Sequence, residues 1–206
     1  MGRRAGTSSE GTREQLLAAA IRVFSARGYE GSRVSEIAAE AELSTGAIYA
    51  NYGSKADLLC AAIRARGPRA VASLLDSGGP GSVVGILRFV GGRLGGATGR
   101  GSGRGTSARA ILVESLAASR REPQVAEVLK SSLEEREDGL AALIRRGQDH
   151  GEIAAEVSPT AVARLCMLLM LGSVVTRTVD LDPVPTQEWE AVINSLVRNL
   201  EPVAVA

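Results

Sequence analysis

The side chains whose types and spacing suit a chemical task are concentrated between Ser44 and Lys55, in the segment STGAIYANYGSK. Hydroxyl, amide and phenol groups follow one another there, and such groups form hydrogen bonds with base edges and phosphate oxygens. Ser44 suits the cap of a helix, because its side-chain oxygen can accept backbone N–H groups of the first turn. The segment therefore predicts a helix whose exposed face is small and polar enough for a groove. That face holds Thr45, Gly46, Ala47, Tyr49 and Asn51.

Residues suited to catalysis or metal binding form no comparable group. His150 is the only histidine and falls in the polar turn GQDHGE, which favours a solvated side chain over a general base. Cys60 and Cys166 are far apart and lack a CxxC or Cys/His spacing, so we expect buried, unreactive thiols. The carboxylates are scattered over helix surfaces. We therefore expect no enzymatic activity, no metal and no cofactor, with a helical enzyme as the last alternative.

The composition favours packed helices. Of the 206 residues 45% are hydrophobic but only 3% are aromatic, and no long stretch alternates with period two. The formal net charge of +1 argues against a polycation that coats nucleic acid indiscriminately, so any DNA binding must come from a local surface. The prediction is an all-α fold with a small head and a larger body.

Two short helices joined by a tight turn must position the polar face, and the segment SEIAAEAELSTGAIYANY supplies them. Ile37 and Ile48 are among its apolar positions, and Ala38 is small enough for two helices to cross at a steep angle. The pattern predicts a helix-turn-helix. A capping pair at Ser54 and Asp57 then opens a fourth helix.

Other helices follow from apolar residues at helical spacing. The first is predicted to begin at the capping pair Thr12 and Gln15 and to end at Arg27, before Gly28. Later helices are expected over residues 83–94, 107–119, 123 to 147 or 151, 160–175 and 186–200. Residues 69–76 are interpreted as a continuation of the fourth helix or a short fifth one, and residues 77–82 as a loop.

Eight glycines lie between Gly91 and Gly105. The Lys-Ser/Thr pair of a phosphate-binding loop is absent, and no predicted strand precedes the segment. Glycine loses more backbone freedom on ordering than any other residue. We therefore expect a flexible loop here.

Neither the interior nor the N-terminus of the chain predicts membrane association. The longest apolar run, from Leu165 to Val175, is interrupted by Gly172 and Ser173 and is too short to span a bilayer. The N-terminus has basic residues without an apolar stretch behind them, which argues against a secretory signal. We expect a cytoplasmic protein.

The order of residues from 12 to 63 resembles the DNA-binding head of the tetracycline-repressor (TetR) family of bacterial regulators. The resemblance implies a helix-turn-helix domain over residues 12–66, joined by helix 4 to a helical ligand-binding and dimerisation domain over residues 67–206. The polar residues 1–11 would be a flexible arm. The matching positions are Thr12, Ala20, Phe24, Gly28, Tyr29, Ile37, Ala38, Ala41, Ser44, Gly46, Tyr49, Tyr52, Lys55 and Leu58.

The same resemblance assigns roles on the recognition helix and around it. It implies that Thr45, Gly46 and Ala47 face the bases, with Tyr49 either on a phosphate or packed between helices. Phosphate contacts are implied for Ser44, Tyr49, Asn51 and Lys55.

Three positions depart from the family pattern. Arg33 stands in place of a Ser or Thr near the start of helix 2, which leaves Ser32 as an imperfect cap, and Asn51 stands in place of a His. Both changes alter the expected phosphate contacts, and Arg33 is counted among the DNA-binding residues. Glu42 stands where the turn usually has glycine, and a left-handed conformation there would cost about 1 kcal/mol.

For the body, the resemblance implies a homodimer on a pseudo-palindromic, double-stranded DNA operator, released by a small apolar ligand. An activator or a ligand-independent regulator stays open as the alternative. Arg88 and Glu114 are the charged residues that could orient a ligand. The expected lining of the ligand cavity is Phe89, Leu112, Leu116, Leu143, Met167 and Met170. The expected dimer interface, in the last two helices, is Leu165, Leu169, Gly172, Trp189, Ile193 and Leu196. For the cavity residues and for the dimer residues, packing in the core of a single chain is the alternative.

Overall fold

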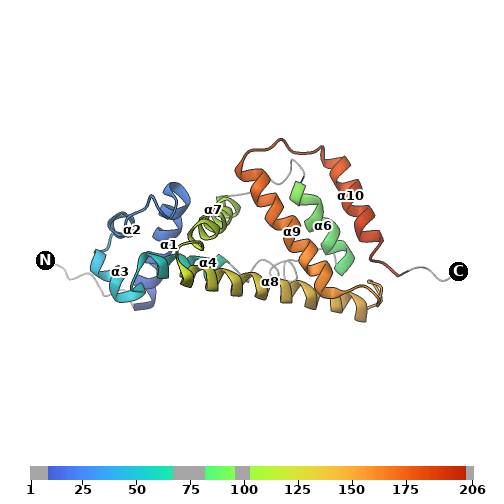
Figure 1. Ribbon diagram of the computed structural model, residues 1–206, viewed down its shortest axis with the longest axis horizontal. Coiled ribbons are helices and arrows are strands. Elements are labelled where there is room, and N and C mark those ends of the chain that lie inside the picture. Colours follow the sequence, from blue (N-terminus) through green and yellow to red (C-terminus); the bar gives the residue numbers. More distant parts are fainter. Residues whose placement is uncertain (1–8, 67–81, 96–102, 203–206) are drawn as a thin grey trace. The chain divides into compact units, whose positions relative to one another are not determined.

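The computed structural model describes residues 9–66, 82–95 and 103–202, apart from the side chains of residues 66 and 103–106. The regular elements within these ranges are all α-helices, with no β-strand among them (Figure 1), so the all-α prediction is confirmed. They are α1 (Ser9–Arg27), α2 (Val34–Glu40), α3 (Thr45–Tyr52), α4 (Lys55–Arg66), α6 (Val83–Gly95), α7 (Gly103–Ala118), α8 (Pro123–Asp149), α9 (Pro159–Thr178) and α10 (Thr186–Arg198).

The chain divides into two compact units. The first comprises Met1–Arg66 and Gly103–Ser132, and so contains α1 to α4, α7 and the first residues of α8. The second comprises Gly67–Ser102 and Leu133–Ala206, and so contains α6, the rest of α8, α9 and α10. Helix α7 therefore belongs to the same unit as the helix-turn-helix, whereas the domain borders expected at 12–66 and 67–206 stay a prediction.

Several helix ends follow from local signals. Gly28 ends α1 with a φ of +73°, and its N–H donates to Phe24 O at 3.0 Å. The Oγ of Ser54 accepts the N–H of Asp57 at 3.0 Å and donates to the Asp57 carboxylate at 2.6 Å, which confirms the predicted capping pair. Ser158 caps α9 in the same way, with Pro159 in the first turn.

The start of α1 differs from the prediction. The helix begins at Ser9, so residues 9–11 are helical and not part of an arm, and residues 1–8 lie outside the described residues. Thr12 is therefore inside the helix and not at its cap. Gln15, its expected partner, instead donates from Nε2 to the backbone oxygen of Ala41 at 2.7 Å, which ties α1 to the end of α2.

Helix α1 is the centre of the first unit, where it packs against α2, α4 and α7. Leu16, Ala20 and Phe24 recur at helical spacing along it, and none of them has any exposed surface. Ile37 from α2 and Leu58 from α4 are equally buried. This packing holds α2 and α3 on a continuous apolar base.

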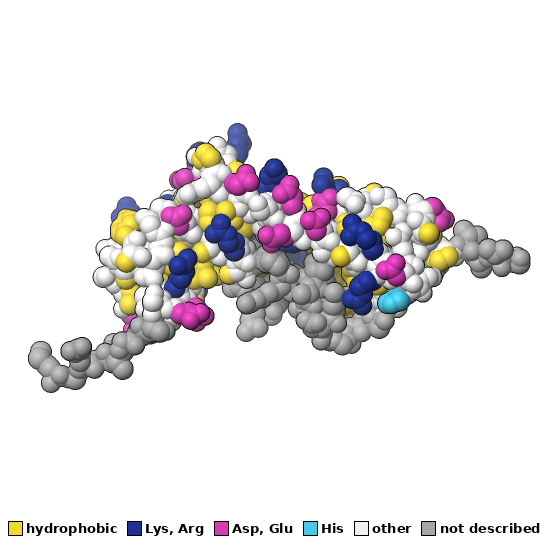
Figure 2. Space-filling model, turned by 90° about the horizontal axis from the view of Figure 1, so that it is seen from below, with side chains coloured by type: hydrophobic (Ala, Val, Ile, Leu, Met, Phe, Trp, Pro, Cys, Tyr) yellow, Lys and Arg dark blue, Asp and Glu magenta, His cyan; other side chains and the backbone are white. Residues whose placement is uncertain are grey.

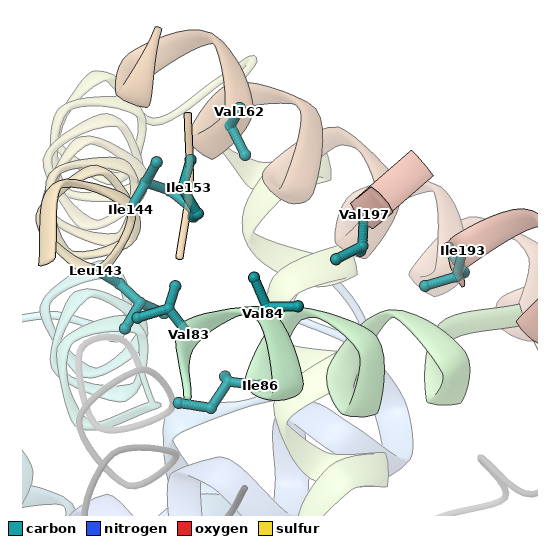
Figure 3. Close-up of a cluster of buried hydrophobic side chains, with 9 residues drawn as sticks. All are labelled: Val83, Val84, Ile86, Leu143, Ile144, Ile153, Val162, Ile193 and Val197. Atoms are coloured by element: carbon teal, nitrogen blue, oxygen red, sulfur yellow. The ribbon is translucent and has the colours of Figure 1, made fainter. Parts of the chain in front are cut away.

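In the second unit, α6 lies between α9 and α10, and it contacts both (Figure 1). The hydrophobic core of the second unit consists of aliphatic side chains from α6, α8, α9 and α10 and from the segment after α8 (Figure 3). Arg164 of α9 adds a bidentate ion pair to Glu137 of α8, with N to O distances of 2.5 and 2.9 Å. The core residues are Val83, Val84, Ile86, Leu143, Ile144, Ile153, Val162, Ile193 and Val197.

The expectation of a flexible loop from Gly91 to Gly105 is wrong at both ends. Residues 91–95 are the last turn of α6, and α7 begins at Gly103; residues 96–102 lie outside the described residues. The glycines of α6 are used for close helix packing. A Cβ on Gly91 would lie 2.8 Å from a methyl carbon of Ile193, and one on Gly95 would lie 2.5 Å from the Trp189 ring. The Trp189 indole N–H also donates to Gly91 O at 2.8 Å.

The expectation that the apolar run of α9 is too short for a bilayer also needs correction. By length and composition, α9 is long and apolar enough to cross a membrane, and it is the one such helix among the described residues. The helix is longer than the apolar run from residue 165 to residue 175, and Gly172 and Ser173 do not break it. Length and composition alone are weak evidence for a span.

We predict that Gly95→Ala destabilises the protein by about 1–3 kcal/mol, because the new methyl group overlaps the Trp189 ring. Urea unfolding followed by circular dichroism measures the change. Gly46→Ala is the matched control, since its Cβ would meet only Ser44 Oγ at an ordinary 3.6 Å. An equal loss in both variants would contradict the packing explanation.

Candidate nucleic-acid interface

The turn between α2 and α3 has the strained backbone that the family resemblance implies for Glu42. Glu42 has a φ of +53°, in the left-handed region. Its N–H donates to Ala39 O at 3.0 Å, and the N–H of Leu43 donates to Ala38 O at 2.9 Å. These bonds satisfy carbonyl groups at the end of α2 and hold the tight turn despite the missing glycine.

Helix α3 has one buried and one exposed face. Ile48 has no exposed surface and Tyr52 is buried, with its phenol donating to Arg13 O at 2.8 Å. Tyr49 is 57% exposed, on the side where Thr45 and Gly46 are also exposed. The Oγ of Ser44 accepts the Ala47 N–H at 3.2 Å, as its predicted capping role requires.

Ala50 and Asn51 are the two remaining residues of α3 on or beside this exposed face. Ala50 is exposed on it and was not among the predicted residues, although the 3.6-residue period places it one turn after Gly46. Asn51 is half-buried, and its Nδ2 donates to Ala47 O at 2.8 Å. One of its two N–H groups is thereby used within the helix, which leaves the other for a contact outside.

The start of α2 is built differently from the predicted cap. Ser32 is buried and donates from Oγ to Tyr29 O at 2.8 Å, so it does not cap the helix. Arg33 is the cap residue, and its own N–H donates to the Glu36 carboxylate at 2.9 Å. The Arg33 side chain is exposed and makes no ion pair or hydrogen bond with the described residues, so it is available to a phosphate.

Lys55 lies half-buried beneath the loop that precedes α2. Its ammonium group donates to Tyr29 O at 2.9 Å and to Ser32 O at 3.1 Å, and it lies 4.4 Å from the centre of the Tyr29 ring. An ammonium group has three protons, so one is left for a phosphate. The structure thus gives Lys55 a structural task, and its contact with DNA stays a prediction.

The acidic residues of α2 are paired with arginines of α1. Arg22 and Glu40 are 2.6 Å apart, and Arg27 and Glu36 are 2.7 Å apart. Exposed pairs of this kind add little stability. They do reduce the negative charge beside the recognition helix, and acidic and basic side chains are interspersed in the same way over the face shown in Figure 2.

The six residues expected to line a ligand cavity are divided between the two units. Leu112 and Leu116 are in the first unit, and the other four are in the second. Phe89 and Leu116 are exposed, and Leu143 is part of the hydrophobic core. The two buried ones on α8 and α9 are Leu143 and Met167, and Met170 is packed against the cluster of Leu140, Ala141 and Ala163.

The charged residues proposed to orient a ligand have other partners. Arg88 of α6 forms an ion pair with Glu201. Glu114 of α7 accepts the backbone N–H of Tyr29 at 2.7 Å.

Burial raises the pKa of the thiols of Cys60 and Cys166, which favours the unreactive thiol form predicted for both.

The expected dimer residues fall into two groups. Leu165, Gly172 and Leu196 are exposed and Leu169 is half-buried, but Ile193 is in the core and Trp189 is packed against it. The last two belong to the side of α10 that contacts α6, so they are not on the free surface. Helices α9 and α10 leave further apolar side chains exposed that were not among the residues expected at the interface. These are Leu168, Val175 and Val192.

An exposed, small and polar face on a short helix, held by a tight turn on an apolar base, defines a helix-turn-helix protein of the DNA-binding class. Comparison with known families agrees. The model described as "Bacterial regulatory proteins, tetR family" matches residues 16–62, and "Tetracyclin repressor-like, C-terminal domain" matches residues 99–193. The chain belongs to the tetR family of bacterial regulatory proteins. It is a DNA-binding transcription regulator and not an enzyme.

Individual relatives support the same class. The HTH-type transcriptional regulator UidR of Escherichia coli (strain K12) is 28% identical over 166 residues, which cover 81% of each chain. HbdR of Aromatoleum sp. (strain CIB), another HTH-type transcriptional regulator, is 44% identical over 50 residues, which cover 24% of this chain and 22% of HbdR.

Solved structures share the fold. Salmonella enterica GusR superposes with a TM-score of 0.75 at 23% identity, covering 94% of this chain and 97% of GusR. A TetR-family regulator from Cytophaga hutchinsonii superposes with a TM-score of 0.79 at 15% identity, covering 97% of this chain and 100% of that one. Regulators of this family bind DNA operators and act as homodimers.

We predict that Glu42→Gly raises the stability of the protein by about 1 kcal/mol, because glycine adopts the left-handed conformation without a steric penalty. The melting temperature measures the change. Glu42→Ala is the matched control: it also removes the carboxylate but keeps the strained backbone. An equal gain from alanine would show that charge, and not backbone conformation, is responsible.

Proposed function

We propose that the protein is a repressor that binds a pseudo-palindromic operator as a homodimer and is released by a small apolar ligand. The single observation that carries the proposal is the exposed face of α3, where Thr45, Gly46 and Tyr49 stand opposite the buried Ile48 and Tyr52. A helix with this arrangement can enter the major groove, which admits an α-helix. The family relationship supports the repressor role, and an activator or a ligand-independent regulator is the alternative.

Base contacts are proposed for the first turn of α3. Gly46 permits a close approach, and the methyl group of Ala47 suits a thymine methyl. Thr45 supplies a hydroxyl group for a base edge. Thr45 and Gly46 are exposed and Ala47 is half-buried at the N-terminal end of the helix, which is the end that contacts bases in helix-turn-helix proteins.

Phosphate contacts are proposed for the residues around that turn. The Ser44 hydroxyl accepts from Ala47 but still has its own proton to donate. Tyr49 is the most exposed large side chain of α3, and Arg33 has an available guanidinium group. Asn51 and Lys55 each have one N–H left after their internal hydrogen bonds.

We propose that a second copy of the chain covers the free faces of α9 and α10. Leu165, Leu168, Gly172 and Val175 recur along α9 at intervals of three and four residues. Val192 and Leu196 of α10, one helical turn apart, are 54% and 46% exposed. Pairing with a symmetry mate in a four-helix seam would bury this surface. The same pairing would explain why α9 is so apolar without requiring that it enter a membrane.

The ligand is proposed to bind in the helical body and to favour an arrangement that does not fit DNA. A ligand with equal affinity for both arrangements would change nothing. Met167 and Met170 are adaptable apolar side chains on α9 and are the parts of the expected lining that we retain. Leu143 belongs to the hydrophobic core of the second unit. In the dimer, the two recognition helices must lie about 34–36 Å apart to enter successive major grooves.

The proposed function is tested by binding of the purified protein to the DNA upstream of its own gene at moderate salt, with an unrelated duplex as the control. Selective binding of a dimer supports a sequence-specific regulator. Equal, salt-sensitive binding to both duplexes argues against recognition of this DNA. Transcription from the bound promoter, with and without the protein, separates a repressor from an activator.

We predict that Tyr49→Ala weakens operator binding about tenfold or more, because an exposed phosphate contact is lost. Tyr49→Phe is the matched variant, which keeps the ring and removes only the hydroxyl. Affinity is measured by fluorescence anisotropy and the dimer by analytical ultracentrifugation. A monomeric Tyr49→Ala protein would show that the contact surface has been misplaced.

We predict that Leu168→Lys produces a monomer, because a charge on the apolar face of α9 opposes its burial. Analytical ultracentrifugation measures the mass. Leu116→Lys, at an exposed leucine of the other unit, should remain a dimer. A dimeric Leu168→Lys protein would exclude this face as the interface.

A further inference from the structure

Tyr29, in the loop between α1 and α2, is held from two segments that lie far away in the sequence. Its N–H donates to the Glu114 carboxylate of α7 at 2.7 Å, and its phenol donates to the Glu122 carboxylate, just before α8, at 3.1 Å. Tyr29 is only 3% exposed, and its ring lies 5.7 Å from that of Phe24 in α1. Burial and the bond to Glu122 raise the pKa of the phenol, so it stays a donor at neutral pH.

The chain around Tyr29 is shaped for the approach of α7. Gly28 combines a φ of +73° with close contact: a Cβ there would lie 3.0 Å from Glu114 Oε2. Any other residue would therefore meet both a backbone strain and the carboxylate. Helix α7 belongs to the same compact unit as the helix-turn-helix and packs against both α1 and α4.

The contacts continue from Tyr29 to the start of α2. Lys55 of α4 bonds to the carbonyl oxygens of both Tyr29 and Ser32, and Arg33, the next residue, is the cap of α2. Helices α2 and α3 contact each other, and each contributes a side chain with no exposed surface, Ile37 from α2 and Ile48 from α3, so the two helices are packed as a pair. The loop is thus fixed by α7 on one side and by α4 on the other.

We propose that Glu114 is a positioning residue for DNA recognition: by holding the backbone at Gly28 and Tyr29, α7 sets where α2 and α3 stand. The inference rests on the proposed function, in which α3 binds the operator. Without the bond between Glu114 and Tyr29, the helix-turn-helix loses this fixed position. If the helix-turn-helix occupies its DNA-binding position in only a fraction of the molecules, the observed affinity for DNA is reduced by that fraction.

The geometry favours this role over a merely stabilising one. A carboxylate that accepts a backbone N–H is a strong, directional bond, and this one joins residues 85 positions apart in the sequence. If the Glu114 carboxylate is removed, the backbone N–H of Tyr29, a residue whose side chain is buried, loses its hydrogen-bond acceptor. The loss therefore acts on the loop before α2 first, and not on the core of the second unit.

The test compares full-length Glu114→Ala, Glu114→Gln and Glu127→Ala. Glutamine keeps an oxygen that accepts the Tyr29 N–H, and Glu127 is an exposed glutamate of α8 in the same unit. Hydrogen exchange is followed by mass spectrometry in peptides from residues 28–44 and from α9 and α10. Affinity is measured for a duplex that the wild-type protein selects from random-sequence DNA.

We expect Glu114→Ala to speed exchange in residues 28–44, to leave α9 and α10 unchanged, and to weaken DNA binding about tenfold. Glu114→Gln should retain affinity within about threefold, and Glu127→Ala should match the wild type. The proposal is overturned by unchanged exchange in residues 28–44, by equally faster exchange in both units, or by a glutamine variant as weak as the alanine variant. A wild-type protein that selects no sequence would overturn the proposed function itself, while the exchange data would still show whether Glu114 holds the loop.

Discussion

The backbone between the end of α1 and the start of α2 is the constraint on which the recognition surface depends. The Tyr29 N–H and the carbonyl groups of Tyr29 and Ser32 lie next to the buried side chains of these two residues, and an unsatisfied backbone group in such surroundings is costly. Glu114, Lys55 and the Ser32 hydroxyl supply the partners. Because α2 starts one residue after this loop, the same bonds that satisfy it also decide where the recognition helix is held.

The recognition surface itself shows a division between two faces of a short helix. The buried face of α3 is apolar and attaches the helix to the unit, while the opposite face has small and hydroxyl-bearing side chains that leave room for a groove. Eight residues are too few for a helix to be stable alone. Its order comes from the cap at Ser44, the turn at Glu42 and burial of Ile48.

The second unit poses the opposite problem, because it leaves apolar surface uncovered. Its core takes one side of α10 through Ile193 and Val197, and the glycines of α6 let that side approach closely. The remaining side of α10 and much of α9 stay exposed, including Leu168 and Val175. Contiguous apolar surface of this kind marks an interaction site in soluble proteins, which fits a family of homodimers.

Features that arise within one or two helical turns could be predicted from the sequence alone. The end of α1 at Gly28, the cap at Ser44 and the pair at Ser54 and Asp57 all depend on neighbouring residues, and the structure has each of them. The left-handed Glu42 was expected from the family resemblance, and the structure has it too. The exposed face of α3 and the all-α fold follow from periodicity in the same way. What only the tertiary structure decided are contacts between distant residues: Glu114 on Tyr29, Trp189 on the glycines of α6, and α7 packed with the head. The physical reason is that local hydrogen bonding and helical period are written in adjacent residues, whereas a contact across 85 positions depends on how every helix between them packs.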